Sequence, residues 1–308
     1  TDPTDKSWDK DRLAKAVEYA DKVAGYTLNN DFTHLYGKTY ESTQQEHIFT
    51  IHHDGDEFDA QGNHQAHCAF TFAFEITKET HIGPADVELY TAPRWADSND
   101  VRREFSYTTR LNNPLESNRE YKFEPPTTLA RFGKGIDRSY ANSVNICLLT
   151  NEVDRIELRY AEVLLTKAEA LLEQGGKDGE ALNYLNLIRS RAGVSQLTGL
   201  SGDELRTALR TEWEHEFVYD QRRWFDLVRW KTLISTVQSV SGFTHYADEY
   251  ETALTTGTAA EKESSAFFAK VYKHLHAKHD NVRGKHYRFP IPLGESMEEL
   301  GITQNPGY

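Results

Sequence analysis

The stretch between His52 and Cys68 carries the side chains of this sequence best suited to bind a metal ion. Imidazole, carboxylate and thiol groups follow one another at short range, from His52, His53, Asp54, Asp56, Glu57, Asp59, His64, His67 and Cys68. Zinc prefers such ligands, but their spacing matches no zinc pattern. The aspartates resemble a calcium loop, yet the bidentate glutamate of an EF-hand is missing from the required position. We therefore expect a polar, exposed loop that contacts a ligand, with no metal and no cofactor.

A second group of side chains, between Phe58 and Asp97, is suited to bind sugars. A pyranose ring needs a flat apolar surface and a few amide, carboxylate or guanidinium groups for its hydroxyls. Trp95, Tyr90 and Phe58 offer flat faces, and Asn63, His64, Arg94 and Asp97 offer polar contacts. These seven residues are the predicted ligand-binding set. For Tyr90 and Trp95, packing inside the protein is the competing interpretation.

Two acidic residues, Glu216 and Asp226, lie among aromatic residues and raise the question of catalysis. A catalytic carboxylate needs a cleft and a shifted pKa, and the sequence shows neither. Charged groups beside tryptophan usually form pairs at the edge of a core. We therefore interpret a set of charged residues as structural acid–base partners: Glu212, Glu216, Arg222, Arg223, Asp226 and Arg229.

The sequence contains none of the common catalytic signatures. It has no nucleophile elbow, phosphate-binding loop, dinucleotide fingerprint or HExxH helix. A metal-dependent hydrolase using the region from His52 to His67 is the least favoured alternative. We expect a binding protein with no catalytic residues.

Helical periodicity identifies the elements that must position these groups. Apolar residues recur at helical spacing over 158–174, where two glycines end the pattern, and again over 178–192. Their lengths predict an antiparallel, tetratricopeptide-like helix pair. Further helices are predicted over 9–24, 201–230 and 261–279, and a strand over 46–51. The polar, aromatic stretch 51–150 lacks helical periodicity and is the predicted place of ligand specificity.

Composition limits the classes of partner. The 308 residues carry a net charge of −13, which disfavours binding to nucleic acid because phosphates would be repelled. No apolar run approaches the roughly 20 residues that a membrane span requires. Cys68 and Cys147 show no disulfide framework, and we expect free, mostly buried thiols, although one disulfide is an open alternative.

Three motifs resemble those of the SusD/RagB family of Bacteroidetes outer-membrane nutrient-binding lipoproteins. The first runs from Arg159 to Ala170 and continues from Asn186 to Gly193. In the second, Glu216 precedes the run from Arg223 to Trp230, and Asp220 and Gln221 replace the family's Glu-Gly pair. The third is the terminus, with F-P-I-P at residues 289–292 and Q-N-P-G-Y at residues 304–308.

The resemblance implies a mainly α fold of tetratricopeptide-like helix pairs, with an irregular loop-rich subdomain and a few short strands. We expect three regions: residues 1–50 continuing earlier helical repeats, the ligand-binding region 51–150, and the helical region 151–308 with an extended, proline-containing end. Because family members are longer, the chain resembles their C-terminal portion.

The implied function is capture of oligosaccharide at the extracellular face of the outer membrane and delivery to a SusC-like TonB-dependent transporter. Membrane attachment would come from an N-terminal lipid that precedes this sequence. Capture of peptides or another nutrient by the same architecture is the alternative, because RagB-type relatives are linked to peptide uptake.

Overall fold

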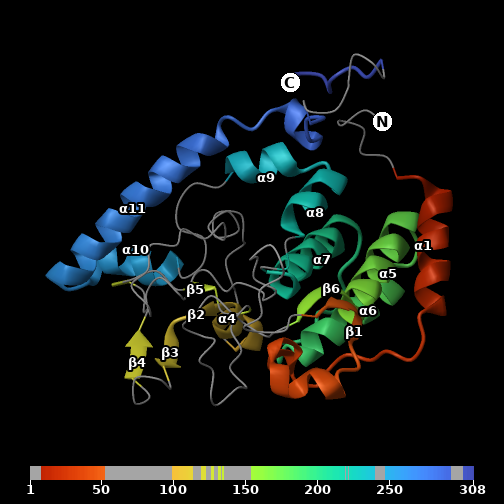
Figure 1. Cartoon of the computed structure of the whole chain (residues 1–308), viewed down its shortest axis with the longest axis horizontal. Coiled ribbons are helices and arrows are strands. Elements are labelled where there is room, and N and C mark those ends of the chain that lie inside the picture. The colour runs from red at the N-terminus through yellow and green to blue at the C-terminus, as the bar shows by residue number, and fades with distance from the viewer. Residues whose placement is uncertain are drawn as a thin grey trace, which may run out of the picture.

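Helices dominate the computed structural model, which describes residues 8–52, 99–113, 119–122, 126–127, 131–132, 134, 154–218, 220, 222–239, 247–292 and 301–308. Three helices lie side by side: α5 (Tyr160–Gln174), α6 (Asp178–Arg191) and α7 (Gly202–Glu216). Helix α1 (Lys10–Lys22) packs on the outer side of α5 (Figure 1). The mainly α fold with packed helix pairs is therefore confirmed.

The core of this helical frame follows directly from the apolar pattern. Leu165 of α5, Leu185 of α6 and Leu209 of α7 are each fully buried. Small residues allow the helices to approach closely, since Ala161 and Ala168 are also fully buried. The short connection from Gly175 to Lys177 makes α5 and α6 antiparallel neighbours, as predicted.

Local signals in the sequence set several helix ends. The Asp9 carboxylate caps α1 by accepting hydrogen bonds from the backbone N–H groups of Asp11 and Arg12 at 3.1 Å. Helix α6 ends in a Schellman motif, in which Gly193 adopts φ +76° and Val194 N–H donates to the Arg189 carbonyl. A side chain at the position of Gly193 would be strained in this conformation.

The predicted helix over 201–230 is wrong as a single element. Helix α7 ends at Glu216, a turn joins Phe217 to Asp220 through a backbone hydrogen bond of 3.1 Å, and α8 (Arg223–Arg229) begins afterwards. The turn places the Asp220 carboxylate against Lys134 and Arg159, which a continued helix would not do. The pairing of buried charges therefore outweighs helix propensity here.

Short antiparallel strand pairs complete the described secondary structure. The predicted strand is β1 (His47–Ile51), and it pairs with β6 (Arg155–Arg159), which the sequence reading had partly assigned to the following helix. The alternating sequence R-I-E-L-R of β6 suits a half-buried strand. The other pairs are β2 (Tyr107–Thr108) with β5 (Arg131–Phe132) and β3 (Arg110–Asn113) with β4 (Arg119–Lys122). The remaining turns of helix are η1 (Phe32–Tyr36), η2 (Lys38–Thr43) and η5 (Gly284–Tyr287).

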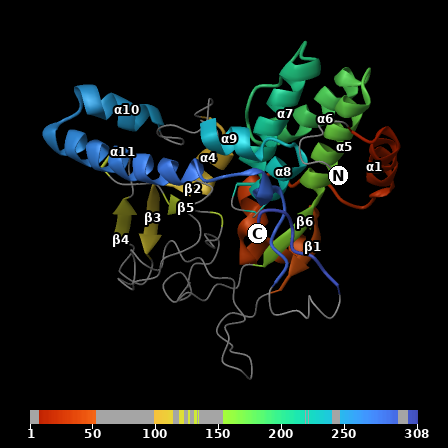
Figure 2. The same ribbon diagram turned by 90° about the horizontal axis from the view of Figure 1, so that it is seen from above.

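A second helical part lies across the molecule from α1. Helix α9 (Leu233–Ser239) leads toward a hairpin of α10 (Ala247–Thr256) and α11 (Ala259–His279), and α11 covers the helix predicted over 261–279. Seen from above, this hairpin and α1 lie at opposite ends, with the short helix α4 (Val101–Ser106) between them (Figure 2). Arg103 of α4 joins the hairpin through an ion pair of 2.9 Å with Glu249. Helix α4 therefore links the helical frame to the hairpin.

The two terminal motifs, F-P-I-P and Q-N-P-G-Y, bind each other. The Gln304 side chain accepts from Ile291 N–H at 2.8 Å and donates to the Ile291 carbonyl at 2.9 Å. Asn305 donates to the Phe289 carbonyl at 2.7 Å. The Phe289 ring lies 6.0 Å from the Trp224 ring of α8 but stays largely exposed. Side-chain amides thus replace the backbone pairing that proline prevents.

Lys231 is a site where glycine should stabilise the protein. It occupies in α8 the position that Gly193 occupies in α6, with φ +57°, and Thr232 N–H donates to the Leu227 carbonyl at 3.0 Å. We expect Lys231→Gly to be about 1 kcal/mol more stable than Lys231→Ala, because only glycine adopts this conformation without steric cost. Urea denaturation of both variants measures the difference. Equal stabilities would show that the backbone there is not strained.

Candidate functional site

The seven predicted ligand-binding residues, Phe58, Asn63, His64, Tyr90, Arg94, Trp95 and Asp97, lie outside the described residues. The same holds for Cys68, Cys147 and the candidate metal ligands from His53 to His67. His52 is described, and its Nδ1 lies 2.5 Å from an Asp154 carboxylate oxygen while most of its ring is exposed. Within the described ranges, no group of three or more histidine, cysteine or acidic side chains is arranged to hold a metal ion.

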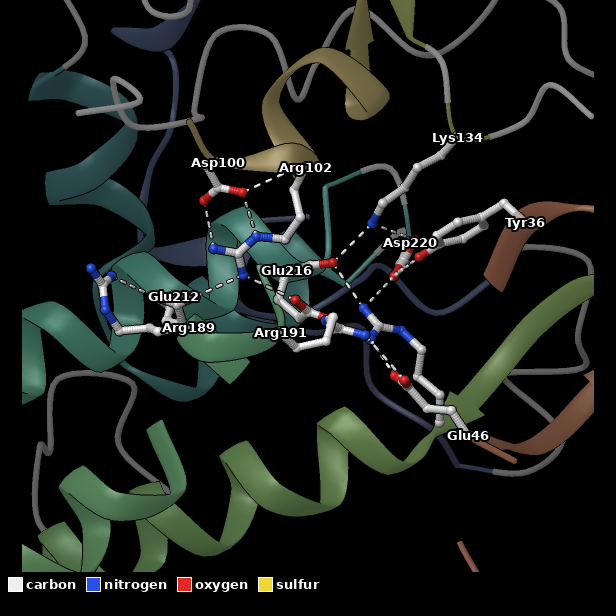
Figure 3. A network of polar contacts seen from close by, with 11 residues as sticks. Tyr36, Glu46, Asp100, Arg102, Lys134, Arg189, Arg191, Glu212, Glu216 and Asp220 are labelled. Carbon is white, nitrogen blue, oxygen red and sulfur yellow. Dashed lines mark hydrogen bonds and ion pairs between the residues drawn. The ribbon is translucent and has the colours of Figure 1, made fainter. Parts of the chain in front are cut away.

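The described residues bring together a network of buried charges at the C-terminal end of α7 (Figure 3). Its members come from α4, β6, α6 and α7, from the residues just before β1 and α4, and from the segments around Lys134 and Asp220. The basic members are Arg102, Lys134, Arg159, Arg189 and Arg191, and the acidic members are Glu46, Asp100, Glu212, Glu216 and Asp220. Elements far apart in the sequence therefore meet at one place.

Glu216 is the centre of this network. Its fully buried carboxylate contacts Arg159 and Arg191 through one oxygen and Arg102 through the other, the last at 3.0 Å. Its backbone carbonyl accepts from Lys134 at 2.9 Å and from Arg159 at 2.8 Å. Burial alone would raise the pKa of Glu216, but Arg191, Arg159, Arg102 and Lys134 hold it well below its usual value. Glu216 therefore stays ionised as a structural anion.

Arg102 connects α4 to α7. Its guanidinium binds both oxygens of Asp100, at 2.9 and 2.6 Å. It also contacts Glu212 at 2.7 Å and is fully buried. Such forked pairing suits the planar guanidinium and fixes direction as well as distance. Helix α4 is thereby held in one orientation on α7.

Lys134 and Asp220 connect the segment after β5 to the same place. The Lys134 ammonium lies 3.2 Å from the Asp220 carboxylate, and Asp220 also lies 3.3 Å from Arg159. The Tyr36 hydroxyl approaches Asp220 at 3.4 Å, and burial raises the pKa of Tyr36 well above its usual value. Lys134 further lies over the Phe32 and Tyr36 rings, 5.3 and 5.1 Å from their centres. Its charge is compensated on several sides.

The balance of charge explains how so many ions are buried together. Five cations face five carboxylates, so the network has no net charge when all are ionised. Arginine keeps its charge at all ordinary pH values and does not serve as a general base. The arrangement is therefore suited to holding the fold in one geometry, in agreement with the structural interpretation of Glu216.

A second set of charged pairs joins α5 to α7 and α8. Glu162 pairs with Arg222, Glu169 with Arg229, and Glu173 with Arg206 at 2.6 Å. The Trp230 indole also donates to Glu169 at 3.0 Å. The partnership of Asp226 with Arg229 follows the sequence expectation, at 3.1 Å.

Burial raises the pKa of Glu214 to about 7, although its partner Arg223 opposes the shift. This is the value expected of a proton-transfer group at neutral pH. The carboxylate, however, is directed at the Arg223 guanidinium. We interpret Glu214 as one more member of a buried ion pair.

The sequence reading missed Glu46 and Lys134 as members of the network. Glu46 is the first residue of the predicted strand, and Lys134 lies within the stretch assigned to loops. Both are almost completely buried, at 0% and 2% exposure. Each contacts partners more than 80 positions away in the chain, and no local spacing signals such pairing.

The family model of SusD matches residues 4–308, which is nearly the whole chain. The chain belongs to the SusD family. Among curated relatives, SusD-like protein P2 of Formosa agariphila is 30% identical over 66% of this chain and 43% of its own length. The starch-binding protein SusD of Bacteroides thetaiotaomicron is 25% identical over 49% of this chain and 21% of its own length. The chain thus spans less than half the length of these relatives.

Solved structures share the fold. A SusD homolog from Bacteroides thetaiotaomicron aligns over 97% of this chain and 60% of its own, with a TM-score of 0.63 and 19% identity. Surface glycan-binding protein A from Bacteroides uniformis aligns over 96% of this chain and 57% of its own, with a TM-score of 0.51 and 23% identity. Among the described helices of the SusD-family chain, none is long and apolar enough to cross a membrane.

Lys134 gives the stability of this SusD-family chain a specific pH dependence. Burial lowers the pKa of Lys134 to about 8 from 10.5, although Asp220 opposes the shift. Between these two values the unfolded chain binds more protons than the native one. The destabilisation of the native state by Lys134 is therefore largest below pH 8 and decreases as pH rises. We expect the stability of the wild type relative to Lys134→Met to rise by about 2 kcal/mol from pH 7 to 9.5.

Denaturant titrations at the two pH values measure this change. The Lys262→Met variant serves as the control, because it removes the same charge from an exposed position. A constant difference between wild type and Lys134→Met would show that Lys134 keeps its ordinary pKa in the native state.

Proposed function

We propose that this chain binds oligosaccharides at the surface of the outer membrane and delivers them to a SusC-like TonB-dependent transporter. The observation that carries the proposal is the match of the SusD family model to residues 4–308. SusD of Bacteroides thetaiotaomicron is named a starch-binding protein, and several solved relatives are named surface glycan-binding proteins. SusD-family relatives are associated with the outer membrane of Bacteroidetes, which supports this location.

The chemistry of the described residues supports binding without catalysis. The acidic side chains at the end of α7 are directed at arginine or lysine, and Glu216 alone contacts three guanidinium groups. A glycosidase instead needs two carboxyl groups placed on either side of a sugar bond. The α7 carboxylates are thus engaged in holding the fold.

The binding surface is proposed in the stretch 51–150, with Trp95, Tyr90 and Phe58 as the stacking faces. Asn63, His64, Arg94 and Asp97 are the proposed polar contacts. Aromatic stacking can bind a sugar with only a modest number of hydrogen bonds. Such binding suits reversible capture and release. The transporter and the N-terminal lipid anchor belong to the same proposal.

Calorimetric titration of the purified chain with maltoheptaose, laminarihexaose, xylohexaose, cellohexaose and mannohexaose tests this function. We expect one of these glycans to bind, and Trp95→Ala to weaken that binding about five- to tenfold through loss of a stacking face worth roughly 1–1.5 kcal/mol. Tyr19→Ala, at an exposed aromatic residue of α1, is the matched control and should bind as the wild type does.

Two results would contradict the proposal. Binding to none of the glycans, together with binding to a tryptic digest of casein, would select peptide capture. Unchanged affinity of Trp95→Ala would remove Trp95 from the site while leaving glycan binding itself in place.

A further inference from the structure

A small part of the predicted ligand-binding region 51–150 lies within the described residues and packs against the helical frame. It consists of residues 99–108, with α4 and β2, residues 131–132, with β5, and Lys134; we call it the base unit. β2 and β5 pair with each other, and α4 contacts both. The predicted ligand-binding residues 58–97 join the base unit at Asn99. The placement of this unit therefore decides where that region starts.

The base unit touches the helical frame through groups at separate points. Arg102 contacts Glu212 and Glu216 near the end of α7, and Val101 N–H donates to the Ala192 carbonyl at the end of α6, at 3.3 Å. On the other side, Lys134 donates to the Glu216 carbonyl at 2.9 Å and pairs with Asp220 at 3.2 Å. Because the base unit is attached on both sides, it cannot rotate about either attachment.

An aromatic contact adds to these polar attachments. The Phe105 ring of α4 lies 5.8 Å from Phe32 and 5.7 Å from Tyr36, which both belong to η1. The same two rings lie beneath the Lys134 ammonium. Arg102 and Lys134 therefore both reach Glu216 from the base unit, Arg102 at its carboxylate and Lys134 at its backbone carbonyl (Figure 3).

We propose that Lys134 is a positioning residue, which together with Arg102 fixes the base unit on the C-terminal end of α7 and thereby orients the ligand-binding region. The orienting role rests on the proposed function, while the fixing of the base unit does not. Lys134 acts through the Glu216 carbonyl and Asp220, which belong to the charge network.

The test is a double variant, Lys134→Met with Asp220→Asn, which removes one positive and one negative charge and so keeps the network neutral. A second variant, Leu13→Ala in α1, removes a buried side chain far from the base unit and provides a control. Denaturant is added to the more stable of the two variants until both have the same global stability. Hydrogen exchange is then followed for the amides of residues 101–108 and 131–132 and for those of α5 and α6.

We expect exchange in the base unit of the double variant to accelerate at least about tenfold relative to α5 and α6, because its attachment opens locally. The glycan bound most tightly by the wild type should bind the double variant at least about fivefold more weakly than Leu13→Ala, a change of roughly 1 kcal/mol. Equal acceleration in the base unit and in α5 and α6 would overturn the proposal. So would equal glycan affinity of the two variants.

The experiment distinguishes failure of the proposed function from failure of the proposed role of Lys134. If no glycan binds the wild type, the proposed function fails, and the exchange measurement by itself still decides whether Lys134 fixes the base unit.

Discussion

Replacing Glu216 by glutamine is expected to lower the free energy of unfolding by about 3–5 kcal/mol, the loss typical of breaking a buried ion pair. The carboxylate contacts Arg102, Arg159 and Arg191, and all four side chains are 4% exposed or less. Glutamine preserves the shape but leaves the network with one uncompensated positive charge. Urea denaturation followed by circular dichroism measures the loss.

Two further variants separate this explanation from a general sensitivity of α7. Glu204→Gln, at an exposed position in the first turn of the same helix, should change stability by less than about 0.5 kcal/mol. Adding Arg191→Met to Glu216→Gln restores the balance of charge and should recover part of the loss. A double variant as unstable as the sum of the two single variants would mean that charge balance is not what stabilises the network.

Acid offers an independent measurement of the same interaction. The arginines hold the pKa of Glu216 well below 4.5, so the native state takes up its proton only at lower pH than the unfolded chain does. The stability that Glu216 contributes is therefore present above pH 4.5 and is lost as pH falls through its native pKa. The advantage of the wild type over Glu216→Gln should shrink over that range.

The helical frame was predictable because its signals are local. The apolar spacing in α5 and α6, the Asp9 cap of α1 and the glycines that end α5 and α6 each depend on residues a few positions apart. The partnership of Asp100 with Arg102 was predictable for the same reason, since two positions separate them. Such features depend little on the rest of the fold.

The charge network was not predictable, because its pairs join distant parts of the chain. Glu46 meets Arg159 across 113 positions, and Lys134 meets Asp220 across 86. The same long-range pairing ends α7 at Glu216, where the periodicity of the sequence favoured a continued helix. The predicted ligand contacts also depend on long-range placement, and they remain predictions for the binding experiments.

Trp213→Ala is expected to destabilise the chain by about 3–5 kcal/mol, as large-to-small changes in a core do. Trp213 is a residue of α7, and its side chain packs against the elements that follow this helix, with 2% exposure. Its ring lies 4.9 Å from the Phe217 ring, and the Arg229 guanidinium lies 4.9 Å from its centre. Alanine would leave a cavity among these groups and would also remove a surface that the arginine covers.

Phe225→Ala is the matched control for Trp213→Ala, because it removes an aromatic ring from α8 that is 62% exposed. Its cost should stay within about 0.5 kcal/mol, since little apolar surface returns to water. Trp213→Phe keeps an aromatic ring in the core and should lose less than Trp213→Ala. Similar losses for Trp213→Ala and Phe225→Ala in urea denaturation would mean that α7 and α8 are not held together by the packing of Trp213.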